Sequence, residues 1–449
     1  MHGTAQPWVP QVIFGLDAAL VSTLILIVTY GVIMSERLNR AVVALVGAGV
    51  MILVGVLNQE AAIRGVDFNT IALLTGMMII VAVTQRCGVF QYIAIWSAKQ
   101  VNASPAGILF MLQVVTAVAS AFLDNVTTVL LIVPVTLAIT RELKVNPYPV
   151  LVSEVFASNI GGTATLIGDP PNILIGSAVG LSFNDFVIAL SPVIIVVQLV
   201  QCAIFHVIYG RRMHATEADR ARVMNFNERD AITDVRLLKQ SLSVLAGVIL
   251  AFVLSRFLHL EAGTIGMFGA AVLIMLDVLG KPPEEQSHEI HKIFGEGVEW
   301  VTIFFFVGLF MVVAGVEAAG VLKWLAEQLV AATGGNMVAT AMAILWGSAI
   351  LSAIVDNIPF VATMIPLIKN MAPAFGGPEN LMPLWWSLSL GACLGGNGTL
   401  IGASANLTVA GLAERAGHPI RFIPFMKIAF PMMLLSIAIC TVYVYWRFL

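Results

Sequence analysis

Two stretches of the sequence carry nearly the same phrase: NIGGTATLIGDPPN at 159–172 and LGGNGTLIGASAN at 394–406. Each interrupts apolar surroundings with glycine and adds threonine and asparagine side chains. In the hydrocarbon core of a bilayer every backbone N–H and C=O must be paired, so a non-helical break is tolerated where it lines a buried or water-filled cavity. The paired stretches therefore predict a central site built from two interrupted helices.

The composition indicates an all-α polytopic membrane protein. Of 449 residues, 59% are hydrophobic and 11% charged, and the mean hydropathy is +0.94, which is too apolar for a soluble domain. Apolar runs that can cross a core of about 30 Å lie at 11–34, 41–58, 70–85, 186–209, 241–258, 262–280, 300–316 and 420–446. The expected partner is the lipid bilayer, because no basic patch interleaved with aromatic residues points to nucleic acid.

Cysteine usage and the amino terminus add little chemistry. Cys87, Cys202, Cys393 and Cys440 show no metal-type spacing, so we expect no metal, no cofactor and no disulfide. The first apolar run lacks a basic region before it and a cleavage pattern after it, as in a retained helix. Nothing in the sequence predicts an enzyme.

The basic residues predict the orientation. The polar segment 211–239 holds seven of the 23 Lys and Arg residues, which favours the cytoplasmic side. This choice places the amino terminus outside and the chain in the cytoplasmic (inner) membrane.

An internal repeat runs through the chain. Adding 232 to a position takes Asp124-Asn125 to Asp356-Asn357 and Pro134 to Pro366, and adding 234 takes Gly161-Gly162 to Gly395-Gly396. We predict a first repeat at 1–210, a cytoplasmic linker at 211–240 and a second repeat at 241–449. Since the first repeat starts outside and the second inside, the repeats have inverted topology, as alternating access requires.

The helix breaks supply the first set of candidate binding residues. An interrupted helix presents free backbone groups, with partial positive charge at one half-helix start. Small residues also let helices pack closely, but packing does not explain the asparagines and threonines. The candidates are Asn159, Gly161, Gly162, Thr163, Thr165, Asn172, Gly395, Gly396, Asn397, Thr399, Ser404 and Asn406.

The second set lies in FLDNVTTVLLIVP at 122–134 and IVDNIPFVATMIP at 354–366. Each places an Asp-Asn pair between apolar runs that look too short to cross twice, which predicts re-entrant hairpins with the pair at the tip. Ionisable groups at such depth are typical of proton relay, ion coordination or substrate contact; the alternative is helix capping. The substrate candidates here are Asn125, Thr127, Thr128 and Asn357, and Asp124 and Asp356 are coupling candidates.

Asp169 breaks the repeat, because its counterpart is Ala403. That asymmetry makes it the strongest candidate for a titrating group or cation ligand, with capping of the second half-helix as the alternative. Glu154 and Glu317 also fall in or near apolar segments and are weaker coupling candidates.

Basic residues are missing from the motif regions 122–140, 153–190, 352–368 and 387–412. A site for a multiply charged anion normally offers a guanidinium or ammonium group. Aspartates beside hydroxyls and amides suit a proton, Na⁺ or an uncharged polyhydroxy solute better.

The phrases DNVTTVLLIVPVT and SNIGGTATLIGDPPNILIG resemble the ion transporter superfamily, in particular the branch of the ArsB arsenite/antimonite permease and the P protein. The resemblance covers the whole chain. It implies a scaffold domain, a mobile transport domain and elevator-type alternating access. Hairpin tips would be 124–128 and 356–357, with helix breaks at 159–172 and 394–406. Paired Ser-Asn-Thr signatures of the related divalent anion symporters are not present, since Ile160 follows Ser158-Asn159 and the second half has Leu390-Gly391-Ala392.

The resulting hypothesis is a secondary transporter that exports arsenite or antimonite, as the neutral trihydroxide, in exchange for protons. Thiolate capture would need about three cysteines, and Cys393 is the one near a motif. Three alternatives stay open: a sodium/proton antiporter, another inorganic or organic anion permease, and a receptor or the membrane half of a pump. A cytoplasmic arsenic ATPase would dock at the 211–239 loop.

Overall fold

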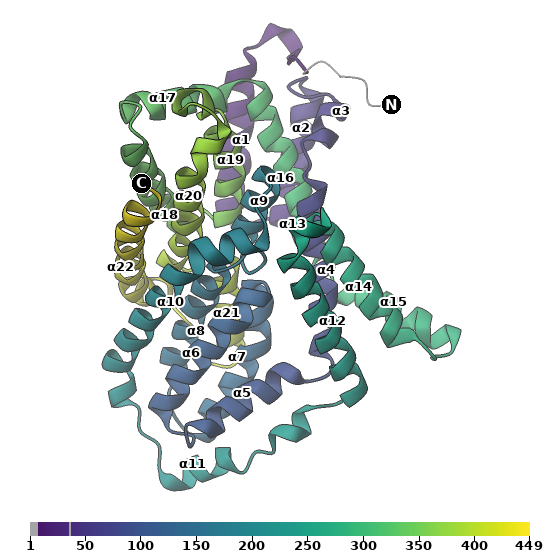
Figure 1. Cartoon of the computed structure of the whole chain (residues 1–449), viewed down its shortest axis with the longest axis vertical. Helices are drawn as coiled ribbons and strands as arrows, with labels where there is room; N and C mark the ends of the chain where they lie inside the picture. Colours follow the sequence, from purple (N-terminus) through teal and green to yellow (C-terminus); the bar gives the residue numbers. More distant parts are fainter. Residues whose placement is uncertain (1–7, 36) are drawn as a thin grey trace.

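The computed structural model describes residues 8–35 and 37–449, and this part of the chain is built from helices and short 3-10 turns (Figure 1). The helices of the first half are α1 (Ala18–Met34), α2 (Arg40–Leu53), α3 (Gln59–Arg64), α4 (Phe68–Gln85), α5 (Val89–Gln100), α6 (Pro105–Phe122), α7 (Asn125–Glu142), α8 (Tyr148–Thr163), α9 (Pro170–Val179), α10 (Phe183–Ile208) and α11 (Glu217–Met224). Those of the second half are α12 (Val235–Val253), α13 (Ser255–Leu258), α14 (Ala262–Val278), α15 (Pro283–Glu296), α16 (Trp300–Ala318), α17 (Val321–Ala332), α18 (Met337–Ile354), α19 (Asn357–Lys369), α20 (Met382–Gly395), α21 (Ser404–Arg415) and α22 (Phe422–Phe448).

The predicted apolar runs all coincide with helices: α1, α2, α4, α10, α12, α14, α16 and α22. The first helix begins at 18 instead of 11, because Asp17 accepts a hydrogen bond from the Leu20 N–H at 2.8 Å and caps it. Within the described residues, eight helices are long and apolar enough to cross a membrane. The chain is an all-α multi-pass membrane protein, as its composition predicts.

The helix boundaries repeat with the offsets seen in the sequence. Helices α5, α6 and α7 begin at positions 89, 105 and 125, which the alignment pairs with 321, 337 and 357, the first positions of α17, α18 and α19. Helix α9 begins at 170, which is paired with 404, the start of α21. In Figure 1, α5 lies near the lower end of the molecule and its counterpart α17 at the upper end. This pair of equivalent helices therefore lies at opposite ends of the molecule, as expected for inverted repeats.

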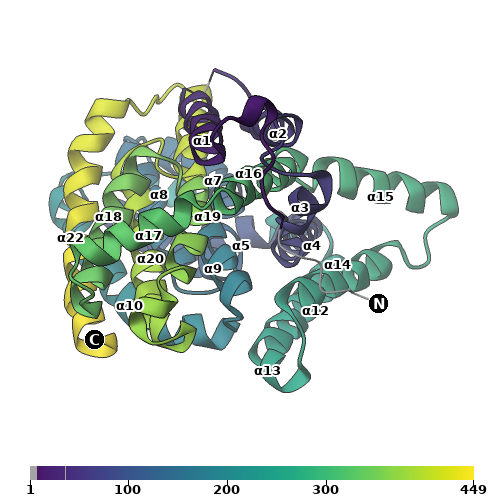
Figure 2. The same cartoon turned by 90° about the horizontal axis from the view of Figure 1, so that it is seen from above.

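Outer helices of each half pack against helices of the other half. Helix α2 packs against α16 of the second half, and α14 packs against α4 of the first half. Both crossings are close: a Cβ on Gly76 would lie 2.4 Å from the Gly266 carbonyl carbon, and one on Gly308 would lie 2.6 Å from that of Ala44. We call α1, α2, α4, α12, α14 and α16 the scaffold helices. Figure 2 shows α4, α12 and α14 on one side of the molecule and α18, α20 and α22 on the other.

The two hairpins are α6–α7 and α18–α19, with turns at 123–124 and 355–356. Their arms are longer than the sequence suggested, since α6, α7 and α18 each have 18 residues and meet the length and hydropathy of a membrane span. The interior prolines Pro134 and Pro366 lie within α7 and α19 and do not end them. The Asp-Asn pairs nevertheless lie at the turns, as predicted.

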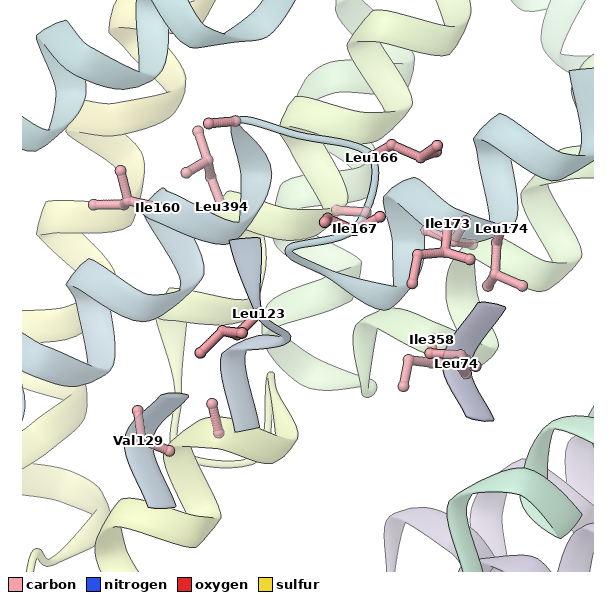
Figure 3. Packing of buried hydrophobic residues seen from close by; sticks show 14 of the residues in the cluster. Leu74, Leu123, Val129, Ile160, Leu166, Ile167, Ile173, Leu174, Ile358 and Leu394 are labelled. Carbon is pink, nitrogen blue, oxygen red and sulfur yellow. The ribbon is translucent and has the colours of Figure 1, made fainter. Parts of the chain in front are cut away.

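Buried aliphatic side chains surround the first helix break. Figure 3 shows Ile160 and Leu394 from the two interrupted helices close to the connecting loop, which carries Leu166 and Ile167. All four are at most 3% exposed. Tight apolar packing thus fixes a non-helical segment that would otherwise be free to move.

The linker runs beneath the first repeat. It contains α11 and two 3-10 turns, Gly210–Arg212 and Glu228–Ala231, and α12 begins at Val235, ahead of the predicted boundary at 241. Lys99 of α5 pairs with Glu228 at 2.6 Å, and Arg222 pairs with Glu142 of α7 at 3.3 Å. Its charges are therefore partly engaged by the protein itself.

Candidate functional site between the two helix breaks

The two predicted breaks are present. Helix α8 ends at Thr163 and α9 begins at Pro170; α20 ends at Gly395, a 3-10 turn spans Gly396–Gly398, and α21 begins at Ser404. The Pro170-Pro171 pair suits the first turn of α9, because proline lacks the N–H that a helix start leaves unpaired. Each break adjoins the hairpin of its own repeat.

The glycines of both breaks serve close packing. A Cβ on Gly161 would lie 2.1 Å from the Ala117 carbonyl oxygen of α6, and one on Gly395 would lie 2.6 Å from that of Ala349 in α18. A Cβ on Gly162 would likewise lie 2.5 Å from the Gly168 carbonyl oxygen, and one on Gly396 would lie 3.0 Å from that of Gly402. A substrate role for these glycines stays a prediction.

Most hydroxyls and amides of the breaks bind the backbone of the same repeat. These contacts occur as matched pairs, each to a backbone carbonyl. From the hairpins, Ser120 donates to Ser158 and Ser352 to Ala392, both at 2.6 Å. From the breaks, Thr165 donates to Ala121 and Thr399 to Ala353, both at 2.5 Å, while Asn172 donates to Thr163 and Thr165 at 3.0 and 2.9 Å and Asn406 donates to Gly396 and Thr399 at 2.8 Å each. They supply acceptors with the donors that an interrupted helix lacks. In this conformation these side chains hold the breaks in shape.

An amide network joins the repeats at the centre. The Asn159 Nδ2 donates to Oδ1 of Asn397 and of Asn406, both at 2.9 Å, and Asn125 donates to the Asn159 Oδ1 at 3.1 Å. All four side chains are at most 3% exposed. Four of the candidate residues, two from each half, thus meet in one buried cluster, and their role in binding stays a prediction.

Asp169 is fully buried and carries an unpaired oxygen. Its Oδ1 accepts from Asn125 at 3.2 Å and from Asn357 at 3.5 Å, and its Oδ2 has no hydrogen-bond partner among the described residues. The side chain makes no capping bond to α9. The capping alternative therefore does not describe Asp169, whose carboxylate instead contacts both hairpins.

Asp124 and Asp356 do cap their helices. Oδ1 of Asp124 accepts from the Thr127 N–H at 2.8 Å, and Oδ1 of Asp356 accepts from the Ile358 N–H at 3.2 Å. The Thr127 hydroxyl also donates to Asp124, whereas the buried Thr128 hydroxyl has no partner among the described residues. Capping leaves the second oxygen of each carboxylate for other contacts.

Four helix starts converge on a small cavity. Its volume is about 30 Å³, room for about two water molecules. The lining includes the first residues of α7, α9, α19 and α21, namely Asn125, Pro170, Asn357 and Ser404, together with Asp124 and Asp169. Helix starts carry partial positive charge, so this arrangement favours a bound anion or the acidic side chains already present.

Arg40 also lines the cavity, which corrects the expectation of a site without a basic residue. Its guanidinium donates to Ser404 Oγ at 2.7 Å and to Thr302 Oγ1 at 3.1 Å, and pairs with Asp356 at 3.4 Å. It lies over the Phe305 ring, 5.1 Å from the centroid. Arg40 belongs to the scaffold and precedes both hairpins in the chain, and in the sequence it looks like a loop charge at the start of an apolar run.

Two further scaffold residues, Glu299 and Thr302, complete the polar lining. They lie just before and just after the start of α16, and no motif of the sequence singled them out. The cavity is thus lined by three carboxyl groups and one guanidinium, and that guanidinium pairs with the carboxylate of Asp356. A second cavity of about 320 Å³ is lined by Arg40, Asp356 and Ser404 and opens beside Tyr30 and Met34 of α1.

A scan against family models matches residues 30–391 with the family described as citrate transporter. An uncharacterised transporter of Mycobacterium tuberculosis is 43% identical over 435 residues, covering 96% of this chain and 99% of that protein. A 46 kDa membrane protein of Mycobacterium leprae is 42% identical over 436 residues, with the same coverage. The human P protein is 32% identical over 506 residues, which span 94% of this chain and 59% of that longer protein.

Two solved structures share the fold. The YdaH transporter of Alcanivorax borkumensis superposes with a TM-score of 0.60 at 12% identity, covering 96% of this chain and 98% of that one. MtrF of Neisseria gonorrhoeae gives a TM-score of 0.53 at 9% identity, covering 97% and 96%. At such low identity the likeness concerns architecture.

Proposed function

The chain belongs to the citrate transporter family, and on that premise we propose that it is a secondary active transporter of a small carboxylate-bearing anion, coupled to protons or other monovalent cations. The observation that carries the proposal is the Arg40 guanidinium among four helix starts. We place the protein in the cytoplasmic membrane, with the linker inside.

The positive groups suit a carboxylate. A guanidinium offers two parallel N–H donors that match the two oxygens of a carboxylate. The N–H groups at the start of α21 add further donors and partial positive charge. Helix α9 begins with Pro170-Pro171, which lack an N–H, so its start contributes partial positive charge without free donors there. In the present conformation Ser404 and Asp356 occupy the Arg40 nitrogens, so the substrate carboxylate would replace them.

The carboxyl groups of the cavity suit bound cations. Asp124, Asp169 and Glu299 line the cavity, and if all three were ionised the cavity would repel an anion, whereas Asp356 is paired with Arg40. An ionised carboxylate at this depth is also costly to keep. Protons or Na⁺ bound at these carboxyl groups remove that repulsion. Anion and cation then bind together, which is the condition for coupling their movements.

The proposed transport cycle uses alternating access between the scaffold helices and the helices that carry the breaks. The central cavity is too small for citrate, whereas the adjoining cavity of about 320 Å³ falls in the range of small-molecule sites, about 300–1,000 Å³. We propose that the hairpins and broken helices move against the scaffold, and that the Arg40, Asp356 and Ser404 contact opens on one side. Because inverted repeats are related by a pseudo-two-fold axis in the membrane plane, the equivalent movement can open the site to the other side of the membrane.

The test uses purified protein in vesicles with an imposed pH or Na⁺ gradient. Citrate and smaller dicarboxylates are offered as radiolabelled solutes, and proton flux without any organic solute is recorded in parallel. Citrate uptake that follows the gradient supports the proposal. Na⁺-driven proton flux that ignores every solute would instead indicate a sodium/proton antiporter, and the anion assignment would be withdrawn.

Export of arsenite or antimonite in exchange for protons is the second candidate. It is favoured by the saturation of Arg40 with internal partners, which leaves amides and the free Asp169 Oδ2 for a neutral trihydroxide. A cytoplasmic ATPase at the linker belongs to this candidate. Arg40→Gln discriminates: it removes citrate transport if the anion proposal is right and spares transport of a neutral solute.

A further inference from the structure

Glu154 is a buried carboxyl group that the central cavity does not use. It lies in the middle of α8 and is fully buried. Its Oε1 accepts a hydrogen bond from the Thr136 hydroxyl of α7 at 2.5 Å, and its Oε2 has no partner among the described residues. An ionised carboxylate with a single neutral donor carries a large uncompensated desolvation cost.

The second repeat shows that the fold does not need this acid. With the offsets that align the helices, Glu154 corresponds to Leu388 and Thr136 to Ile368. The register is secure, because Pro149 of α8 matches Pro383 of α20 in the same alignment. Leu388 and Ile368 are fully buried, so the same place in the duplicated architecture is filled by hydrocarbon.

No cation compensates Glu154 in the described residues. The helices packed against α8 are α6, α7, α10, α20 and α21. Their ionisable side chains are Arg141 and Glu142 at the end of α7, Asp185 and His206 near the ends of α10, Cys202 within α10, Cys393 in α20, and Glu414 and Arg415 at the end of α21. None of these forms a hydrogen bond or ion pair with Glu154. The neutral carboxylic acid is the form that this environment accommodates.

The position lies between the central cluster and the linker. Glu154 precedes Asn159 by five residues, about 7.5 Å of helix, on the side of α8 that leads to its start at Tyr148. The neighbouring α7 ends at Glu142, whose side chain pairs with Arg222 of the linker. Glu154 is therefore displaced from the cavity toward the predicted cytoplasmic face.

We propose that Glu154 is a second proton-binding site, separate from the central cavity, which exchanges its proton with water on the linker side during the transport cycle. The proton leaves as the O–H bond of the carboxylic acid breaks and is accepted by a water molecule, and the reverse step restores the acid. The inference rests on the proton coupling proposed above and adds a place where one coupled proton is held.

Infrared difference spectroscopy tests the site without any transported solute. Purified full-length protein is titrated in detergent and in lipid, and the band of protonated carboxyl groups is followed. We expect a component of this band to vanish in Glu154→Gln and to remain in Glu327→Gln, a control acid that is exposed on α17. A band that is identical in the wild type and Glu154→Gln would overturn the proposal.

Transport at equilibrium tests the coupling. One proton fewer per cycle lowers the accumulation ratio of the solute about tenfold for each pH unit of gradient. We expect this loss in Glu154→Gln and in the double variant Glu154→Leu/Thr136→Ile, which copies the packing of the second repeat. Solute exchange at equal pH should persist in both, which shows that the variants fold and bind.

Different results would overturn the proposed function and the Glu154 site. If the wild type accumulates no solute under any gradient, the proposed function is wrong. If the wild type is driven by the pH gradient and both Glu154 variants retain the full accumulation ratio, the function stands and the Glu154 proposal falls.

Discussion

The two repeats share a backbone frame but differ in the side chains that face the middle. Ser120 and Ser352 make the same bond to the neighbouring interrupted helix, and so do Thr165 and Thr399 to the neighbouring hairpin. Yet Asp169 of the first break corresponds to Ala403 of the second, and Arg40 reaches Asp356 at one hairpin tip. The side chains that shape the breaks are thus the same in both repeats, whereas the ionisable side chains near the centre differ.

The largest expected effect concerns Asp169, where the repeats differ by a charge. Asp169→Asn keeps an oxygen for Asn125 and Asn357 but removes the titrating group. We expect gradient-driven uptake to fall below detection in reconstituted vesicles, while the melting temperature stays close to that of the wild type.

A swapped variant, Asp169→Ala with Ala403→Asp, sharpens that result by moving the acid to the other break. Recovery of coupled transport would mean that the carboxyl matters and its side of the pseudo-symmetry does not. Full activity in Asp169→Asn itself would remove Asp169 from the coupling mechanism.

The next largest effect is expected for substitutions of Arg40. This residue pairs with Asp356 at the second hairpin turn, whereas Asp124 at the first hairpin turn has no guanidinium partner in the described residues. Arg40→Ala leaves Asp356 unpaired, and losses of about 2–5 kcal/mol are typical when one partner of such a pair is truncated in a binding site. We expect citrate affinity to drop by more than tenfold in a binding titration. Arg40→Lys, which keeps the charge without the fork geometry, should recover part of it; equal affinity in all three proteins would contradict the anion site.

The paired glycines test whether the frame is equally tight in both halves. Gly161→Ala and Gly395→Ala each force a Cβ against a carbonyl oxygen, and overpacking of this kind costs about 1–3 kcal/mol. Thermal unfolding in detergent should show both losses, with the larger at Gly161 because its approach is closer. Gly247→Ala, on an open face of α12, is the control and should not destabilise the protein.

The smallest effects are expected at the matched serines. Ser120→Ala and Ser352→Ala each delete one interhelical hydrogen bond, worth about 0.6 kcal/mol on average in a membrane. The two losses should agree within error in the same unfolding assay, and Ser243→Ala, an exposed position on α12, should show none. A marked difference between the two serine variants would mean that the equivalent hydrogen bonds contribute unequally to the stability of the two repeats.

The fold was predictable to a large extent from local patterns. Among the described residues, apolar length located five of the eight helices that are long and apolar enough to span a membrane and missed α6, α7 and α18. The constant offset between Asp124-Asn125 and Asp356-Asn357 revealed the repeat. Asp169 stood out because duplication supplied Ala403 as an internal reference. Each of these signals lies within one segment or compares two segments of one chain.

Contacts between distant segments were beyond such reasoning. Arg40 approaches Asp356 across 316 residues, and nothing near Arg40 in the sequence distinguishes it from a loop arginine such as Arg37. The same holds for Glu299, which reaches the cavity because α16 is packed by α2. Asparagine and threonine content located the breaks, but it could not separate side chains that hold the backbone from those that face the cavity.

The exchanged packing of α2 on α16 and of α14 on α4 has a consequence for biogenesis. During synthesis the first half emerges with α2 and α4 still lacking their glycine-lined partners, which are translated after the linker. The packing of each half is therefore complete only when both halves are present in the membrane. Two separately produced fragments, divided within the linker, should accumulate when made together and be degraded when made alone.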